Sequence, residues 1–416
     1  MMRTEGPGST PPDLWPEIER RLQVDSGDRR SMIMHSEHVG EVTGARRLAV
    51  VLVALGLSAV SLALVVRSFS GGPAEPNSGP SPSTPLVVAW SGLVPGWNDI
   101  AEPPQVRSEA VTVWTGRTLL VWAGTTGDGD RLFSDGFVYD PASEEWTAMP
   151  EAPLSPRRLA GGVWTGISLL VWGGKDDTGA LGDGASFDPK SGAWKMIPAS
   201  PIAPRAPLAS LWTGTEFIVW GSTHEGPHRT DGAAYDPVTE AWRILPQAPI
   251  ELTLGAAAWT GSEMVVVGGP ITPSGESAPP TAQAAAFSPP DGRWTLLPSP
   301  GLSGLAVTGA WDGSAFIAWD YLLQSASLHL GQQDWEPLGS IPIERQECSP
   351  LGVAIPGLVF GQRCDSSVVL ARGMWKDVTS AWGSNHQPPF PVPAGAVVVV
   401  LAEGVEGPPV VKAYLP

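Results

Sequence analysis

The chain has 416 residues, of which 42% are hydrophobic and 16% are charged, so it is too apolar to be disordered over most of its length. Its 49 glycines and 44 prolines follow no collagen-like period, and its 19 tryptophans require many separate half-buried sites. The net charge of −17 arises beyond Arg67, where 17 basic residues face 34 acidic ones, and such a surface repels phosphate backbones and argues against a nucleic-acid partner.

The first 47 residues are nearly neutral and contain one segment with a helical pattern, Asp13–Leu22. Leu14, Ile18 and Leu22 fall on one face of a helix there, and the aspartate that opens the segment can cap it. We expect a short juxtamembrane amphipathic helix. The alternative is that residues 13–22 bind a cytoplasmic protein.

A run of nineteen residues without charge, Leu48–Val66, follows. A helix of that length spans about 30 Å, the thickness of a bilayer's hydrocarbon core. Arg46 and Arg47 precede the run, and after Arg67 the next basic residue is Arg107. The positive-inside rule therefore predicts a transmembrane helix over 48–66, with the amino terminus in the cytoplasm and the rest of the chain outside.

A cleaved signal peptide is the competing interpretation of this apolar run. The 47-residue leader is too long for one, and no A-x-A cleavage site follows. Residues 67–85 are rich in glycine, serine and proline and predict a tether between membrane and exported domain. We therefore expect a single-pass protein of the cell membrane.

Beyond the tether, four stretches repeat one pattern, in which an apolar run ends in Trp-Thr-Gly and a second apolar run follows. They are VTVWTGRTLLVWAG (111–124), GVWTGISLLVWGG (162–174), SLWTGTEFIVWGS (210–222) and AAWTGSEMVVVGG (257–269). Each is followed by a shorter stretch: DGFVYDPASEEW, DGASFDPKSGAW, DGAAYDPVTEAW and AAAFSPPDGRW. One unit thus contains four short strands, with a hairpin around Thr-Gly and a proline turn after the third.

The tryptophans that begin the fourth strands count the units. They are Trp97, Trp146, Trp194, Trp242, Trp294, Trp335 and Trp375. Trp97 has no unit before it, whereas the strands predicted over 396–402 and 410–415 have no such tryptophan after them. We therefore expect a circle of seven units in which the segment around Trp97 supplies the outer strand of the last one.

The unit resembles the kelch repeat of the galactose-oxidase-like superfamily, in which a glycine doublet ends the second strand and Tyr-Asp-Pro and Trp follow. Gly173-Gly174 and Gly268-Gly269 match the doublet, whereas Ala123-Gly124 and Gly221-Ser222 differ from it by one residue. Tyr139 and Tyr235 match the aromatic position, and Phe187 and Phe287 replace tyrosine there. The resemblance covers residues 86–416 and implies an all-β, seven-bladed propeller, expected here on a membrane-anchored bacterial protein.

Three arginines, Arg107, Arg157 and Arg205, each stand seven residues before a first-strand tryptophan. With Arg158 they are our candidate ligand-binding residues, because arginines at equivalent loops of adjacent blades predict an anion-binding mouth. Arg345 is the candidate for a fourth such position, and Arg131 and Arg229 add positive charge to the same predicted side. The alternative is that Pro-Arg belongs to the repeat and that each guanidinium holds its own loop in place.

The sequence offers no complete catalytic or metal site. His224 and His228 lie in one loop with Glu225 and Asp231, but no third ligand is fixed by their spacing. The acidic loops at 128–130 and 176–177 are too short for a calcium motif, and no G-x-S-x-G or H-E-x-x-H occurs. We therefore expect no cofactor and no enzymatic activity.

The leading functional hypothesis is a binding module that presents propeller loops to a protein, peptide or glycan outside the cell. One alternative is a sensor that relays ligand binding to a cytoplasmic protein. The other is an extracellular carbohydrate-active enzyme, which metal content and turnover on sugars would indicate.

Cys348 and Cys364 stand eight residues before and eight residues after Pro356. A hairpin centred on that proline places them on facing strands, at a separation that a disulfide spans. We expect this disulfide, which is compatible with an exported domain. The alternative is two free, buried cysteines.

Overall fold

The computed structural model describes residues 90, 92–127, 129–222, 229–270, 281–304, 306–329, 331–332, 334–343, 351–355, 357–363, 366–378, 390–402 and 410–416. The amphipathic helix, membrane span and tether expected before residue 86 lie outside this part of the chain. Among the residues described, no helix has the length and apolar character that crossing a bilayer requires.

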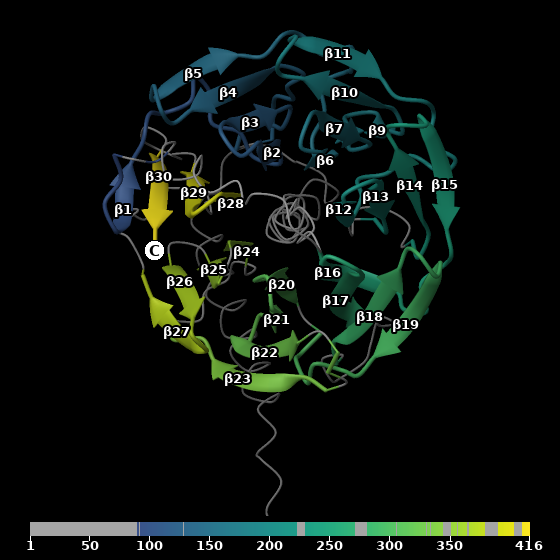
Figure 1. Cartoon of the computed structure of the whole chain (residues 1–416), viewed down its shortest axis with the longest axis vertical. Coiled ribbons are helices and arrows are strands. Elements are labelled where there is room, and N and C mark those ends of the chain that lie inside the picture. Colours follow the sequence, from purple (N-terminus) through teal and green to yellow (C-terminus); the bar gives the residue numbers. More distant parts are fainter. Residues whose placement is uncertain are drawn as a thin grey trace, which may run out of the picture. The chain divides into compact units, whose positions relative to one another are not determined.

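Seven four-stranded antiparallel sheets form a closed ring, and in each blade the strands follow one another outward from the centre (Figure 1). Blade 1 contains β2 (Val111–Trp114), β3 (Leu119–Trp122), β4 (Gly136–Asp140) and β5 (Glu145–Ala148). Blade 2 contains β6 (Gly161–Trp164), β7 (Leu169–Trp172), β10 (Gly184–Asp188) and β11 (Ala193–Met196), with a small ribbon, β8 (Lys175–Asp176) and β9 (Gly179–Ala180), beside it. Blade 3 contains β12 (Ala209–Trp212), β13 (Phe217–Trp220), β14 (Gly232–Asp236) and β15 (Ala241–Leu245).

The second half of the ring continues the same order. Blade 4 contains β16 (Leu252–Trp259), β17 (Met264–Pro270), β18 (Gln283–Ser288) and β19 (Arg293–Leu297). Blade 5 contains β20 (Thr308–Trp311), β21 (Ala315–Trp319), β22 (Gln324–His329) and β23 (Glu336–Ser340). Blade 6 contains β24 (Leu351–Ile355), β25 (Leu358–Arg363), β26 (Ser366–Ala371) and β27 (Met374–Asp377).

The seventh blade joins the two ends of the propeller, as predicted. It contains β28 (Phe390–Ala394), β29 (Val397–Ala402) and β30 (Val410–Leu415), and its outer strand is β1 (Gly96–Asp99) from the start of the domain. Trp97 lies opposite Tyr414 in this sheet. The prediction of seven blades closed by the segment around Trp97 is therefore confirmed.

The hydrophobic core lies between neighbouring blades. Every residue of Leu119–Trp122 is buried, as expected for a strand with a sheet packed on each face. One cluster unites Val111 and Leu120 of blade 1 with Leu169 and Val171 of blade 2, and similar clusters follow around the ring. Each blade therefore completes its core only against its neighbours, which explains why the repeat must close into a ring.

The fourth-strand tryptophans also connect each blade to the preceding one. Trp194 packs against Phe187 at 4.9 Å between ring centroids, and Trp97 makes the same kind of pair with Tyr414 at 5.2 Å. Six of these indole N–H groups each donate a hydrogen bond to a backbone carbonyl of the preceding blade or of the connection that follows it. They belong to Trp97, Trp146, Trp194, Trp242, Trp294 and Trp335. These residues build the ring, as the sequence analysis expected.

In blade 6 the register of the first hairpin differs from the one assumed for the cysteine pair. Ile355 pairs with Leu358 and Leu351 with Gln362, so the hairpin is centred between residues 356 and 357 and not on Pro356. Residues equidistant from Pro356 are therefore not partners in the described part of this hairpin. Cys348 and Cys364 lie outside the described residues, and their disulfide stays a prediction.

Thiol counting tests that disulfide directly. We expect no reactive thiol in the denatured, unreduced chain and two after reduction, because Cys348 and Cys364 are its only cysteines. Two reactive thiols before reduction would contradict the disulfide.

Candidate functional site

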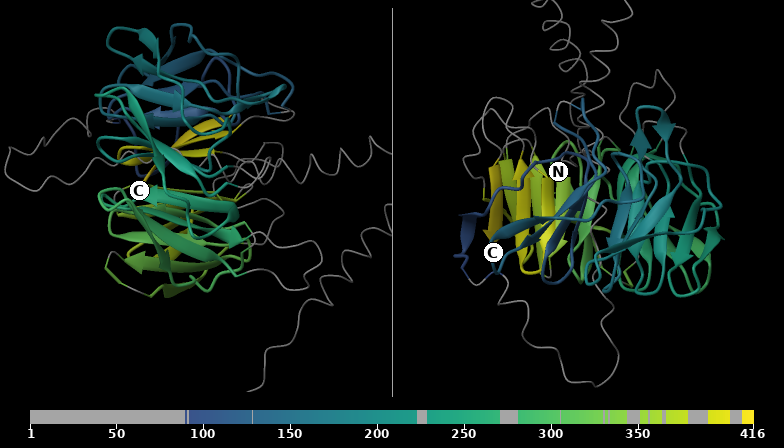
Figure 2. Two further views of the ribbon diagram at one scale, coloured as in Figure 1. Left: turned by 90° about the vertical axis from the view of Figure 1, so that its right-hand side faces the viewer. Right: turned by 90° about the horizontal axis from the view of Figure 1, so that it is seen from above.

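The strands run between two faces of the ring, so each connection that the structure describes falls on one face or the other (Figure 2). We call the loop face the one formed by connections from second to third strands, such as 123–135, and by connections between blades, such as 149–160. The opposite turn face consists of the hairpins between first and second strands and the turns between third and fourth strands. The predicted binding residues all belong to the loop face.

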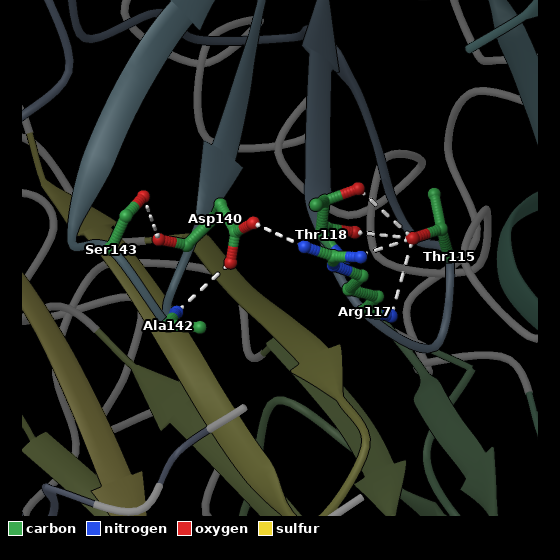
Figure 3. Close-up of polar contacts among 6 residues, drawn as sticks. All are labelled: Thr115, Arg117, Thr118, Asp140, Ala142 and Ser143. Carbon is green, nitrogen blue, oxygen red and sulfur yellow. Dashed lines mark hydrogen bonds and ion pairs between the residues drawn. The ribbon is translucent and has the colours of Figure 1, made fainter. Parts of the chain in front are cut away.

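The turn face repeats one set of local hydrogen bonds. In blade 1 the Thr115 hydroxyl accepts from the backbone N–H of Thr118 at 2.9 Å, and Asp140 accepts from Ala142 N–H at 2.9 Å and from Arg117 at 3.2 Å (Figure 3). Threonine makes the first of these bonds in three further blades, at Thr165, Thr213 and Thr260. These polar groups shape the turns, and the threonine recurs in four of the blades.

On the loop face, three buried arginines each bind an aspartate of their own blade. Arg157 Nη1 and Nη2 lie 2.7 and 3.1 Å from Oδ1 and Oδ2 of Asp183, and Nη1 also donates to the Gly173 carbonyl. The corresponding pairs are Arg205–Asp231, at 2.8 and 2.9 Å, and Arg107–Asp135, at 2.9 Å. We call these three pairs the Arg–Asp clasps. Each clasp ties the connection before the first strand to the loop before the third strand.

The clasps present their acidic members to solvent. The arginine side chains of Arg107, Arg157 and Arg205 are 1%, 1% and 2% exposed, whereas Asp135, Asp183 and Asp231 are 56%, 43% and 30% exposed. Arg107, Arg157 and Arg205 therefore form no shared cationic mouth, because each of these guanidinium groups is buried and paired within its own blade. This is the arrangement expected if Pro-Arg belongs to the repeat and holds its own loop, and it leaves these arginines without the exposed donors that an anion site needs.

The electrostatics of the clasps follow from burial and pairing. Burial lowers the pKa of Arg107, against the opposing effect of Asp135, and this guanidinium also packs over the rings of Phe133 and Phe137 at 4.1 and 4.7 Å. Hydrogen bonds from Arg205 hold the pKa of Asp231 below its ordinary value, although burial acts to raise it. Pairing with Arg205 thus keeps Asp231 ionised at neutral pH.

A close approach of backbone segments explains the glycine doublet beside the clasps. A Cβ atom on Gly174 would lie 2.7 Å from the Arg158 carbonyl oxygen, and the residue has a φ of +96°. Gly124 occupies the same position in blade 1, where a Cβ would lie 2.7 Å from the Ser108 carbonyl oxygen. Glycine therefore lets the end of the second strand pack directly on the connection that enters the blade.

Arg158, the fourth candidate residue, makes a different contact. Its Nη1 lies 3.0 Å from Oε2 of Glu109, which belongs to the connection entering blade 1, and the two side chains are 25% and 6% exposed. Lys175 lies beside this pair, because its backbone N–H and C=O both bond to Arg158. The structure thus joins Arg158, Glu109 and Lys175 at the seam between blades 1 and 2.

The remaining candidates are dispersed. Arg131 is exposed and lies over Phe133, and Asp176 accepts hydrogen bonds from Thr178 and Gly179 within its own turn. Arg345, His224, Glu225 and His228 lie outside the described residues. Within the described part of the chain, no group of three or more His, Cys, Asp or Glu side chains forms a metal-ligand cluster.

The sequence analysis missed the acidic partners of the clasps and two residues of the seam. Asp135, Asp183 and Asp231 each precede a glycine at the start of a third strand, and this recurring Asp-Gly was the signal that could have revealed them. Glu109 and Lys175 have no counterpart of the same residue type in the neighbouring repeat, where Leu159 and Thr125 take their places, so the repeat pattern gave no signal for them.

Comparison with known proteins supports the kelch assignment. Residues 94–269 match the KLHDC2/KLHL20/DRC7 Kelch-repeats domain, a range that starts just before β1 and ends within β17. No curated protein matches the chain. Among solved structures, the chain is similar to one titled "Structure of YjhT", with 14% identity and a TM-score of 0.46 over 76% of this chain and 96% of that chain. Residues 94–269 are therefore similar to a kelch-repeat domain, and the strand pairing of the described residues gives a seven-bladed β-propeller.

Proposed function

We propose that this kelch propeller is the non-catalytic binding module of a membrane-anchored protein and that its loop face recognises a protein, peptide or glycan outside the cell. Kelch propellers serve as protein-interaction modules, and the ring supplies a rigid platform for its loops. The clasps hold the loops in place, so we assign recognition to the residues around them and not to an anion-binding mouth of arginines.

The contrast between the two faces carries this proposal. The turn face repeats the same threonine-capped hairpin in four blades, whereas the loop face changes from blade to blade. Its connection from second to third strand extends from Trp122 to Gly136 in blade 1 but only from Trp319 to Gln324 in blade 5. Variable loops on a uniform scaffold are the usual place of recognition in rigid folds.

Two matched charge reversals in blade 1 test which face binds. Arg131→Glu changes an exposed residue of the loop face, and Arg117→Glu changes a side chain of the turn face that is 78% exposed. For ligands found by screening the full chain against glycan and peptide arrays, we expect the first change to weaken binding several-fold and the second to leave it unchanged. Weakening by Arg117→Glu alone would place recognition on the turn face and contradict the proposal.

Membrane topology is tested separately. The arginines at 46 and 47 and the apolar run that follows them support an uncleaved anchor with its amino end inside. With a tag at each end, protease added to intact cells is expected to remove the carboxy-terminal tag and leave the amino-terminal one. Protection of both tags would contradict export. A cytoplasmic protein bound to residues 13–22 would point to the sensor function.

A further inference from the structure

Three charged residues meet at the seam between blades 1 and 2. The Glu109 carboxylate is almost completely buried and pairs with Arg158 at 3.0 Å. Arg158 and Lys175 form an isolated antiparallel bridge in which each backbone N–H donates to the other residue's carbonyl oxygen at 2.9 Å. Side chains of directly opposed residues in such a bridge project to the same side. The cationic side chains of Arg158 and Lys175 therefore project to the same side, and the Glu109 carboxylate pairs with Arg158.

The repeat provides an internal comparison for this cluster. Blade 1 has the same bridge between Ser108 and Thr125, with hydrogen bonds of 2.9 and 2.8 Å, and neither residue is charged. Glu109 has a left-handed backbone with a φ of 57°, and Leu159 occupies the equivalent position in blade 2 with a φ of 58°. The backbone arrangement thus forms without any of the three charges, so folding of the repeat does not account for them.

The environment of Lys175 favours its neutral amine. Burial lowers the pKa of Lys175, and the neighbouring Arg158 lowers it further, while Glu109 opposes them and leaves it at about 8. The carboxylate of Asp176, next in sequence, is engaged by Thr178 and Gly179. At about pH 7.5 a pKa of about 8 leaves on the order of a hundred times more neutral amine than an ordinary lysine has. A neutral ε-amine is the nucleophilic form.

We propose that Lys175 is an acyl-acceptor site, modified by small anionic acyl donors such as acyl phosphates that are drawn to the paired cations of the seam. The Nζ lone pair attacks the carbonyl carbon, and a C–N bond forms. The bond between the carbonyl carbon and the phosphate oxygen breaks, and phosphate leaves with the electron pair. The proton lost from Nζ passes to solvent or to the leaving phosphate. The products are an amide and inorganic phosphate.

Acylation changes the charge of the seam without disturbing its ion pair. Before the reaction Glu109, Arg158 and Lys175 together carry one positive charge, and afterwards they carry none. The Arg158–Glu109 pair remains, and the repulsion between the two adjacent cations is removed. The modification therefore alters the charge that the loop face presents between blades 1 and 2.

The chain has five lysines, so the acetylation rate of Lys175 can be compared with the rates of the other four in one sample. The four others, Lys190, Lys195, Lys376 and Lys412, lie in the described part of the chain and serve as references in the same sample. The full chain is treated with acetyl phosphate at about pH 7.5, and peptide mass spectrometry follows acetylation of each lysine. We expect Lys175 to react on the order of ten times faster than the mean of the others, because its larger neutral fraction outweighs its lower basicity. Equal or slower reaction of Lys175 would overturn the proposal.

An Arg158→Gln variant tests the role of the neighbouring cation. Without Arg158, one of the two effects that lower the pKa of Lys175 is lost and burial remains, so its advantage over the four reference lysines is expected to fall several-fold. Because rates are compared within one sample, the ratio is meaningful wherever circular dichroism shows that the variant is folded. An unchanged ratio would show that the paired cations do not set the reactivity and would overturn the proposal. Neither result bears on whether the loop face binds a ligand.

Discussion

The Asp183→Ala variant is expected to lower the free energy of unfolding by about 3 kcal/mol, because it leaves the charge of Arg157 buried without its partner. The Arg157 side chain is 1% exposed, and its remaining bonds go to Ser155 and to the Gly173 carbonyl. These neutral acceptors compensate the charge only in part. Urea denaturation of the full chain at neutral pH, followed by tryptophan fluorescence, measures the loss.

Blade 4 supplies the matched control. At the positions of Arg157 and Asp183 it has Leu252, which is buried, and Gln283, which is exposed. Copying that pair into blade 2 as Arg157→Leu with Asp183→Gln is expected to recover most of the lost stability, because no buried charge remains. A double variant as unstable as Asp183→Ala would show that the clasp acts through something other than charge compensation.

The same clasp predicts a dependence on pH. Burial acts to raise the pKa of Asp183, but the hydrogen bonds and charge of Arg157 outweigh it and hold the pKa below the ordinary value of 3.8. A lowered pKa in the folded state contributes stability that is present above the unfolded value and is lost as the pH falls through the folded value. The difference between wild type and Asp183→Asn is therefore expected to be constant above about pH 5 and to shrink below about pH 4. A difference that persists unchanged at about pH 3 would contradict this assignment.

The architecture was predictable from the sequence because it is periodic. Tryptophan recurs at one place in each blade, and Trp97 without a unit before it indicated a closed circle. That inference holds even in blade 6, where the glycine doublet and the Tyr-Asp-Pro motif are absent, because Leu370 pairs with Trp375 in the same register. Period and turn residues determine topology, and both are visible in a sequence.

The candidate site was less predictable, because sequence spacing can assign a side chain to a loop but does not identify the residue with which it forms an ion pair. The position of Arg157 was right, but its burial depends on Asp183, which lies 26 residues further along the chain. The seam is harder still, since Glu109 and Arg158 are 49 residues apart and belong to different blades. A hairpin register that is off by one residue, as at Pro356, is likewise invisible until the strands are paired.

The Trp97→Ala variant is expected to lose about 3 kcal/mol of stability, because it removes a large aromatic side chain from the blade that joins the two ends of the propeller sequence. Trp97 packs against Tyr414 at 5.2 Å and Phe360 at 5.8 Å, and its indole N–H donates to the Val378 carbonyl. The substitution therefore leaves a cavity between blades 6 and 7 and an unpaired carbonyl. Thermal unfolding and urea denaturation of the full chain measure the loss.

Asp99→Ala is the control on the same strand. Asp99 is 85% exposed and pairs with Lys412, so its removal is expected to change stability by less than about 1 kcal/mol. The two variants separate the strand's packing from its surface charge. If Trp97→Ala proved as stable as wild type, β1 would contribute little to closure, and the ring would have to be held by blades 1 to 6 and the inner strands of blade 7. If Asp99→Ala were as damaging as Trp97→Ala, closure would depend on the ion pair with Lys412 instead of on the buried indole.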